Sequence, residues 1–283
     1  MKKEKEGYTK FCYFTYFLNS ISQTSMFPNK KEKNEILKEI LENKMEYKNM
    51  KADMIYIFHK ENDNFLHGKI GRKSSIRINI PAERDFVEKI DSDYPNCSIL
   101  FNLNNNPIDG QRIAFEYNSR IFQSPEAQIK AFSNHLNSLL FGSGYAISIN
   151  PIVDQRDFWE IVKRYQGKIE KLTFSYAVPN LFEIKDSLSE ELKKSAEKYG
   201  STNVNIGLEN KAGLVIIPEN DKFVKESIEY TGKGGGEYRL KIKNMSTEIR
   251  STRSIKTKTI DGIDLIVDNE VEFKKAIKNI FDI

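Results

Sequence analysis

Basic side chains alternate with apolar ones over residues 237–243, a spacing that suits contact with a polyanion. If this segment is a strand, one of its faces carries Glu237, Arg239, Lys241 and Lys243. The three cations then project about 7 Å apart, close to the phosphate spacing of one nucleic-acid strand. A second strand over 254–260 places Lys256 and Lys258 on one face among Ser and Thr hydroxyls, which often donate to phosphates. The pattern predicts a two-strand basic hairpin.

A glycine-rich turn precedes these strands and adds a second means of holding an anion. Gly232-Lys233-Gly234-Gly235-Gly236 can adopt positive φ angles and present backbone N–H groups to an anion. The run fits neither a Walker A loop nor a dinucleotide fingerprint, so nucleotide binding is not predicted. The predicted nucleic-acid contacts are Lys233, Gly234, Gly235, Arg239, Lys241, Lys243, Arg253, Lys256 and Lys258.

Charge distribution supports this segment as the contact surface. Residues 231–260 hold eight Lys or Arg and two Glu, a local charge of +6, whereas the whole chain carries +4. The positive charge is therefore concentrated in one place, which favours a nucleic-acid backbone as the ligand. The alternative is a solvated edge hairpin whose lysines discourage edge-to-edge aggregation.

Catalytic and metal-binding motifs are sparse. Glu183-Ile184-Lys185 resembles the Glu-x-Lys of restriction-type nucleases, with Asp154 or Asp157 as the upstream acid that would help hold a divalent metal. His59 and His67 face each other across a predicted hairpin whose turn is 61–63, without a nearby cysteine to support a zinc site. No catalytic residue, metal or cofactor is predicted, and the metal-dependent nuclease is kept as an alternative.

The elements that must position these residues indicate an α+β fold with mostly antiparallel sheets. An aromatic-rich strand is expected over 8–19, and helices are expected to begin near Ser124-Pro125, at 157, 187, 222 and 270. Strands and helices mix without steady alternation. Gly142-Ser143-Gly144 marks the expected boundary between two α+β domains, residues 1–142 and 145–283, the second carrying the basic hairpin.

Composition indicates a globular protein of the reducing cytoplasm. The chain of 283 residues is 39% apolar and 30% charged. Cys12 and Cys97 lie in apolar surroundings without CxxC spacing, which favours buried free thiols. The apolar run 11–18 is too short to span a bilayer, so membrane insertion is not expected.

The second half also resembles a known group. A strand near Ile147, a helix at Asp157-Phe158-Trp159, the strand ending at 174–182 and the basic segments 230–243 and 255–258 are similar to the C-terminal region of RexA-like proteins of phage exclusion and abortive infection. The resemblance covers residues 145–270. It implies a cytoplasmic, DNA-binding homodimer that senses phage replication and acts with a partner effector in antiviral defence.

The leading hypothesis is therefore a non-catalytic protein that grips nucleic-acid phosphates without reading bases, with DNA favoured over RNA. A protein-interaction subunit that touches no nucleic acid is the third possibility.

Overall fold

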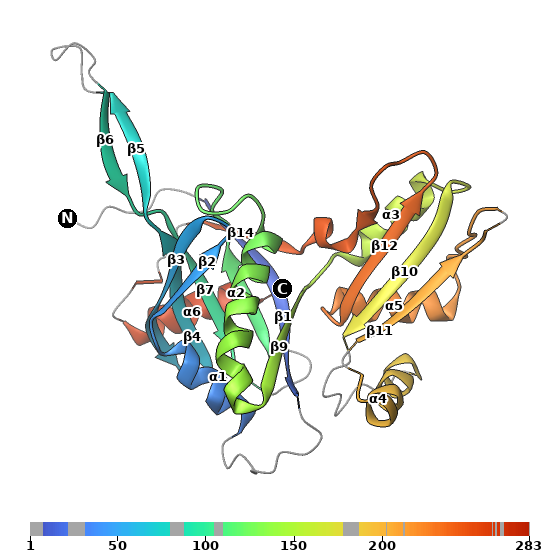
Figure 1. The fold of residues 1–283 in the computed structure, drawn as a ribbon, viewed down its shortest axis with the longest axis horizontal. Helices are drawn as coiled ribbons and strands as arrows, with labels where there is room; N and C mark the ends of the chain where they lie inside the picture. The colour runs from blue at the N-terminus through green and yellow to red at the C-terminus, as the bar shows by residue number, and fades with distance from the viewer. Residues whose placement is uncertain are drawn as a thin grey trace.

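The chain folds into two bodies, each built on an antiparallel sheet with packed helices (Figure 1). The main body comprises described residues within 8–153 and 256–282, and the inserted body comprises those within 155–254. Every strand pairing in the described part of the chain is antiparallel, so the expected α+β class is confirmed. The computed structural model describes residues 8–21, 32–79, 88–104, 110–177, 187–201, 203–211, 213–261, 263, 265–266 and 269–282.

The main body contains an eight-stranded sheet, called here the large sheet. Its order is β14-β1-β8-β7-β4-β3-β2, and β9 also pairs with β1. The strands are β1 Tyr8–Ser20, β2 Met45–Asn49, β3 Ala52–Asn62, β4 Phe65–Arg72, β7 Asn96–Asn102, β8 Arg112–Glu116, β9 Tyr145–Pro151 and β14 Thr257–Asp261.

Strand β1 is buried on both faces because its aromatic residues alternate between two cores. On one face, Phe14 and Tyr16 pack with helices α1 (Lys33–Leu41) and α2 (Pro125–Leu140). On the other face, Phe11 and Tyr13 pack with helix α6 (Glu270–Phe281). The large sheet is thus the middle layer of three, and an aromatic strand buried on both sides is what this position requires.

Helix ends follow the capping residues seen in the sequence. The Ser124 hydroxyl accepts a hydrogen bond from the Ala127 N–H at 3.2 Å, and Pro125 occupies the first helical position of α2. Asn269 caps α6 in the same way through the Val271 N–H at 2.9 Å. The expected starts of α2 and α6 are therefore confirmed.

The inserted body is built on a four-stranded sheet, called here the small sheet, in the order β11-β10-β12-β13. Helices from three segments pack against one face of it and form a separate apolar core with Leu172, Phe174 and Tyr238. The elements are α3 Gln155–Arg164, β10 Ile169–Ala177, α4 Ser187–Tyr199, β11 Asn203–Glu209, α5 Lys222–Gly232, β12 Gly236–Ile242, β13 Ile249–Arg250 and the short 3-10 helix Ser251–Ser254.

The inserted body interrupts the main body between β9 and β14. Both of these strands pair with β1, β9 over residues 14–20 and β14 over residues 8–12. The chain leaves and returns through two adjacent segments joined by the Val153–Ile255 bridge. The division expected at 142–145 therefore does not coincide with the two sheets, because strand pairing and α6 packing return both flanks to the main body.

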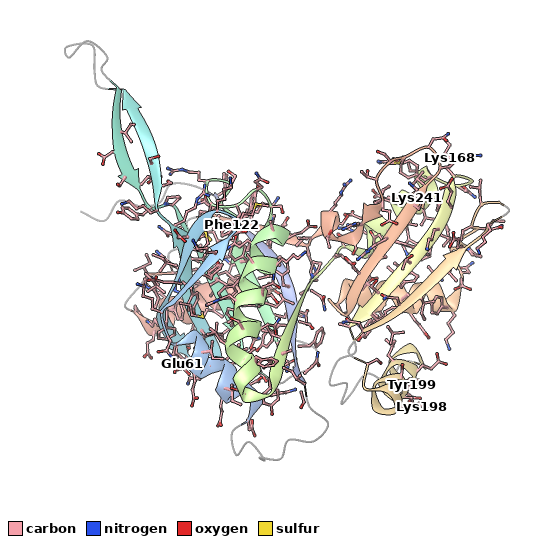
Figure 2. The ribbon with its side chains drawn as sticks, in the orientation of Figure 1. Glu61, Phe122, Lys168, Lys198, Tyr199 and Lys241 are labelled. Carbon is pink, nitrogen blue, oxygen red and sulfur yellow. The ribbon has the colours of Figure 1, made fainter. Side chains whose placement is uncertain are left out.

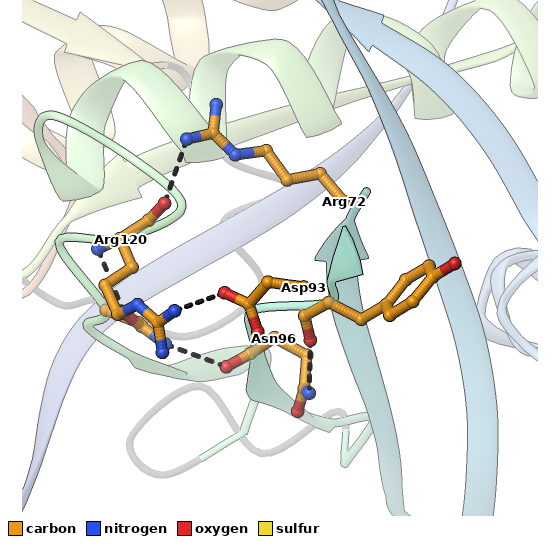
Figure 3. A network of polar contacts seen from close by, with 6 residues as sticks. Arg72, Asp93, Asn96 and Arg120 are labelled. Carbon is orange, nitrogen blue, oxygen red and sulfur yellow. Dashed lines mark hydrogen bonds and ion pairs between the residues drawn. The ribbon is translucent and has the colours of Figure 1, made fainter. Parts of the chain in front are cut away.

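A two-stranded ribbon projects from the main body (Figure 1). It consists of β5 Ser74–Asn79 and β6 Glu88–Asp93. At its base, Arg120 pairs with Asp93, and Arg72 Nη2 donates to the Arg120 carbonyl at 2.9 Å (Figure 3). These contacts fix the ribbon to the loop that precedes α2.

Both cysteines are buried free thiols, as expected. Burial raises the pKa of Cys12 to about 11 and that of Cys97 to about 12. Both side chains are therefore protonated at neutral pH and pack as small apolar groups.

The expected hairpin of β3 and β4 brings two histidines together. A register shift beside His59 sets its ring against that of His67, with centroids 5.6 Å apart. His67 is fully buried, and neither of its ring nitrogens has a hydrogen-bond partner. The ring centroid of Phe273 in α6 lies 6.1 Å from that of His67. Burial, helped by His59 and Lys69, lowers the pKa of His67 to about 3. Within the described residues no group of three His, Cys, Asp or Glu side chains is placed to hold a metal.

Because His67 is buried and neutral, we expect the free energy of unfolding to decrease at acidic pH. Its folded-state pKa lies below the ordinary value of about 6.5, so the unfolded chain binds the proton more readily and stability falls as pH drops from about 6.5 towards 3. The slope from this residue approaches about 1.4 kcal/mol per pH unit. Urea unfolding at pH 7 and pH 5 should show this loss, and His67→Phe should reduce it.

Half-exposed His135 supplies the matched control. Burial also lowers the pKa of His135, but its side chain is only partly buried, so His135→Gln should reduce the pH dependence between pH 7 and pH 5 less than His67→Phe does. An equal loss of stability in His67→Phe and in the parent would assign the acid sensitivity to other groups.

Candidate nucleic-acid interface

The small sheet has one face covered by helices and one open polar face, called here the open face. Strand β10 turns Leu172, Phe174 and Tyr176 towards α3 and α5, so the intervening residues point the other way. The open face carries Lys171, Thr173 and Ser175 of β10, Asn203, Asn205, Gly207 and Glu209 of β11, Glu237, Arg239 and Lys241 of β12, and Arg250 of β13. None of these positions holds an apolar or aromatic side chain.

Cations lie directly opposite one another across the strands of the open face. Lys171 pairs in register with Lys241, and Arg239 pairs in register with Arg250. Opposite residues have Cβ atoms about 5 Å apart, and successive outward residues on a strand are about 7 Å apart. Like charges in this arrangement repel each other, and a bound anion relieves that repulsion.

Internal partners compensate part of this charge. Lys171 Nζ lies 3.3 Å from Glu209 Oε2, Arg239 pairs with Glu237, and Lys241 Nζ donates to the Met245 carbonyl at 2.7 Å. The Lys171 and Glu209 side chains are 41% and 48% exposed, so their ion pair contributes little and yields readily to a phosphate. Four cations against two carboxylates leave the open face positive.

The positive surface continues past the end of β12. Lys168 and Lys243 are both exposed there, and the Lys243 N–H donates to the Lys168 carbonyl at 2.8 Å. Figure 2 shows Lys168 and Lys241 at the same end of the small sheet. Three of the residues expected to bind nucleic acid, Arg239, Lys241 and Lys243, thus share one surface.

The two-strand basic hairpin expected from the sequence is wrong. Strand β12 belongs to the small sheet, whereas β14, which carries Lys258, pairs with β1 in the large sheet. Lys258 Nζ donates to the carbonyls of Asn279 at 2.6 Å and Asp282 at 2.8 Å, so it stabilises the C-terminal end of α6. Arg253 is exposed in the 3-10 helix that leads back to the main body.

The glycine turn is packed and cannot serve as the expected anion loop. Gly234, Gly235 and Gly236 are buried, and the N–H groups of Gly234 and Gly235 donate to the carbonyls of Thr231 and Tyr230, each at 2.9 Å. Gly234 has φ +84°, and a Cβ there would lie 2.5 Å from Thr15 Oγ1 of β1. Glycine is needed here because the turn docks closely onto the large sheet.

Two other predicted cations, Lys233 and Lys256, line a cleft between the bodies. The Thr15 hydroxyl donates to the Lys233 carbonyl at 2.9 Å, which holds this part of the turn beside β1. The structure therefore divides the predicted cations between the open face and its continuation past β12, the cleft, the 3-10 helix and the end of α6.

Of the residues in the nuclease alternative, Asp154 and Asp157 lie within the part of the chain that the structure describes. Glu183 and Lys185 lie outside the described residues. Asp154 is the N-cap of α3, where it accepts a hydrogen bond from the Arg156 N–H at 3.0 Å. The Arg156 guanidinium is the main cause that lowers the Asp154 pKa to about 2.

Comparison of the chain with protein-family models, with curated proteins and with solved structures gives no match. None of the helices in the described ranges combines the length and the apolar composition needed to cross a bilayer. The site must therefore be interpreted from its own chemistry.

Sequence reasoning missed Lys171 as an interface residue and counted Arg250 only as part of the basic segment. The alternation over 169–176 places Lys171 on the polar side of its strand, so a signal for that residue was present. Its position opposite Lys241 depends on strand register, which the alternation does not give.

Because the glycine turn packs closely against β1, we expect a single added methyl group at Gly234 to destabilise the protein. Gly234→Ala should lower the free energy of unfolding by about 1–3 kcal/mol, because alanine resists the positive φ and its Cβ meets Thr15. Gly142→Ala is the matched control, since a Cβ there has nothing within 4 Å. Equal denaturant midpoints for the two variants would contradict the packed turn.

Proposed function

We propose that this protein binds the phosphate backbone of nucleic acid on the open face of the small sheet, without catalysis and without base-specific readout. The observation that carries the proposal is the cross-strand register of cations, Lys171 opposite Lys241 and Arg239 opposite Arg250, on a face that none of the described helices of the inserted body covers. Closely spaced cations at strand spacing match a chain of phosphates.

The polar residues beside the cations support the same ligand. Thr173 and Ser175 offer hydroxyl groups, and Asn205 offers an amide, in the rows next to the basic ones. Such groups commonly donate to phosphate and sugar oxygens. Gly207 adds no side chain above the sheet, so a backbone can approach closely at that position.

The absence of aromatic side chains from these outward positions argues against base stacking. Proteins that hold single strands by their bases use aromatic platforms, each worth about 1–3 kcal/mol per base. Among the described strand positions, the open face has charged, hydroxyl, amide and glycine residues together with Ala177, and no aromatic ring. We therefore expect similar affinities for unrelated sequences, and DNA remains the favoured ligand in the proposal.

The biological setting rests on the resemblance of residues 145–270 alone. On that basis we propose a cytoplasmic homodimer that acts with a partner effector in phage defence. Light scattering on the purified chain tests the dimer, and infection of cells that carry or lack the gene tests the defence role. A monomer, or equal phage yields, would remove that part of the proposal.

Binding to duplex DNA should depend steeply on salt. Neutralising Lys171 and Arg250 together (Lys171→Gln/Arg250→Gln) should reduce the slope of log affinity against log salt by about 2, because two phosphate contacts are lost. Fluorescence anisotropy with two unrelated duplexes between 50 and 200 mM salt (roughly the range over which such contacts are lost) measures both the slope and the sequence preference.

Lys130 provides the matched control, because it is exposed on α2 of the main body. Lys130→Gln should leave the slope unchanged. A flat salt response of the parent protein, or an undiminished slope in the double variant, would remove the open face as the binding surface. No binding at low salt would favour a protein-interaction subunit instead.

A further inference from the structure

Strand β11 is the outermost strand of the small sheet, and in the described part of the chain it pairs with β10 alone (Figure 1). It has seven residues, whereas the other strands that end a sheet path, β2, β13 and β14, have five, two and five. The outer edge of a strand offers backbone N–H and C=O groups to any further strand, so a long edge is a potential interface.

Other strand edges in the described ranges are protected against such pairing. Helix α2 covers the outer edge of β9, where Asn137 Nδ2 donates to the Ile147 carbonyl at 2.9 Å and the Ile147 N–H donates to Asn137 Oδ1 at 2.7 Å. Strand β2 carries Lys48, a residue type that discourages edge pairing. Strand β11 contains no Lys, Arg or Pro, and no register shift interrupts its pairing with β10. These edge defences are therefore missing from β11.

The sequence of β11 is complementary to a second copy of itself. Residues that lie opposite one another in a sheet point to the same face, so the axis of a two-fold antiparallel pairing passes through a residue, and the middle residue is Ile206. Val204 then lies opposite Leu208 of the second copy, and Ile206 lies opposite its own counterpart. On the open face Asn205 lies opposite Gly207. None of these pairs brings like charges together.

The apolar side chains of β11 are incompletely covered within one copy. Val204, Ile206 and Leu208 pack at the margin of the inserted body's core and are only half-buried, whereas Leu172 and Phe174 of the adjacent β10 are fully buried. A second β11 strand would cover part of the surface that remains exposed. Removing that apolar surface from water favours the pairing.

Further apolar side chains are exposed beyond the two ends of β11. Tyr199, at the end of α4, is 70% exposed (Figure 2), and Ile216, in the segment that follows β11, is 87% exposed. The Val215 N–H donates to the Ile169 carbonyl at 2.8 Å, which places that segment beside the start of β10. Because paired copies run in opposite directions, the Tyr199 end of each copy meets the Ile216 end of the other.

We propose that two copies of this chain pair through β11, antiparallel and centred on Ile206. The two small sheets then form one continuous sheet, and both open faces lie on the same side of it. Neighbouring strands are about 4.8 Å apart, so the β10 strands of the two copies lie about 14 Å apart. Lys171 and Arg239 of both copies then face one duplex. This last step rests on the proposed function of the open face, whereas the pairing rests on β11 itself.

Light scattering on the full chain over a series of concentrations tests the interface. We expect a dimer, and Tyr199→Ser/Ile216→Ser should raise its dissociation constant about tenfold or more, because apolar contacts are lost at both ends of β11. Met50→Ser is the matched control, since Met50 is 89% exposed between β2 and β3 of the main body. The replaced side chains are all exposed, and a cooperative thermal transition checks that each variant is folded.

A disulfide measurement tests the register. Oxidation should link two chains of Ile206→Cys, because the Cβ atoms of directly opposite residues lie about 5 Å apart. Asn205→Cys should stay unlinked, because its counterpart lies on the diagonal at about 7–8 Å, beyond the reach of a disulfide. Cys12 and Cys97 are buried and do not compete.

Three results would overturn the proposal: a monomeric parent, an undiminished dimer in folded Tyr199→Ser/Ile216→Ser, or no link through Ile206→Cys. The nucleic-acid surface is tested separately, because Lys171→Gln/Arg250→Gln should dimerise as the parent does. Duplex binding with the expected salt slope by a chain that does not pair through β11 would refute this interface and leave the open face standing. A β11 dimer that binds no duplex would do the reverse.

Discussion

Strand β1 is the constraint on which the arrangement of this protein depends. One edge of β1 pairs with β9 over residues 14–20 and with β14 over residues 8–12. The two segments that connect the main body to the inserted body contact β1 between these pairings, at Tyr13. The Tyr13 N–H donates to the Lys256 carbonyl at 3.2 Å, and the Tyr13 carbonyl accepts from the Ile152 N–H at 2.9 Å. Its hydroxyl also donates to the Ile280 carbonyl at 2.6 Å, at the end of α6. One buried residue thus ties the large sheet, both connecting segments and α6 together.

The position of the inserted body follows from a second contact with β1. The turn after α5 rests on Thr15, only two residues from Tyr13, and the positive φ of Gly234 allows that approach. The same turn places Lys233 in the cleft, while β12, which follows it, carries Arg239 and Lys241 outward on the small sheet. The cleft and the open face are therefore separate surfaces that share one packed turn, and a basic segment that is continuous in sequence divides between them.

Much of the fold could be predicted from local patterns. The aromatic run of β1 and the Ser124-Pro125 cap of α2 each gave an element close to its observed bounds, because burial and capping act over a few residues. The pairing of β14 with β1 could not be predicted in this way, since about 240 residues separate the two strands and no local signal encodes the partner.

The sequence by itself determined the concentration of positive charge, the outward alternation of Arg239 and Lys241, and the chemistry of the two buried thiols. Only the tertiary structure decided which cations lie on the same surface. Strand register set Lys171 opposite Lys241, and the return of the chain to β1 placed Lys256 in the lining of the same cleft as Arg112. Side-chain type and alternation depend on neighbouring residues, whereas a binding surface depends on contacts between distant segments, which form only when the sheets and the packed turn are in place.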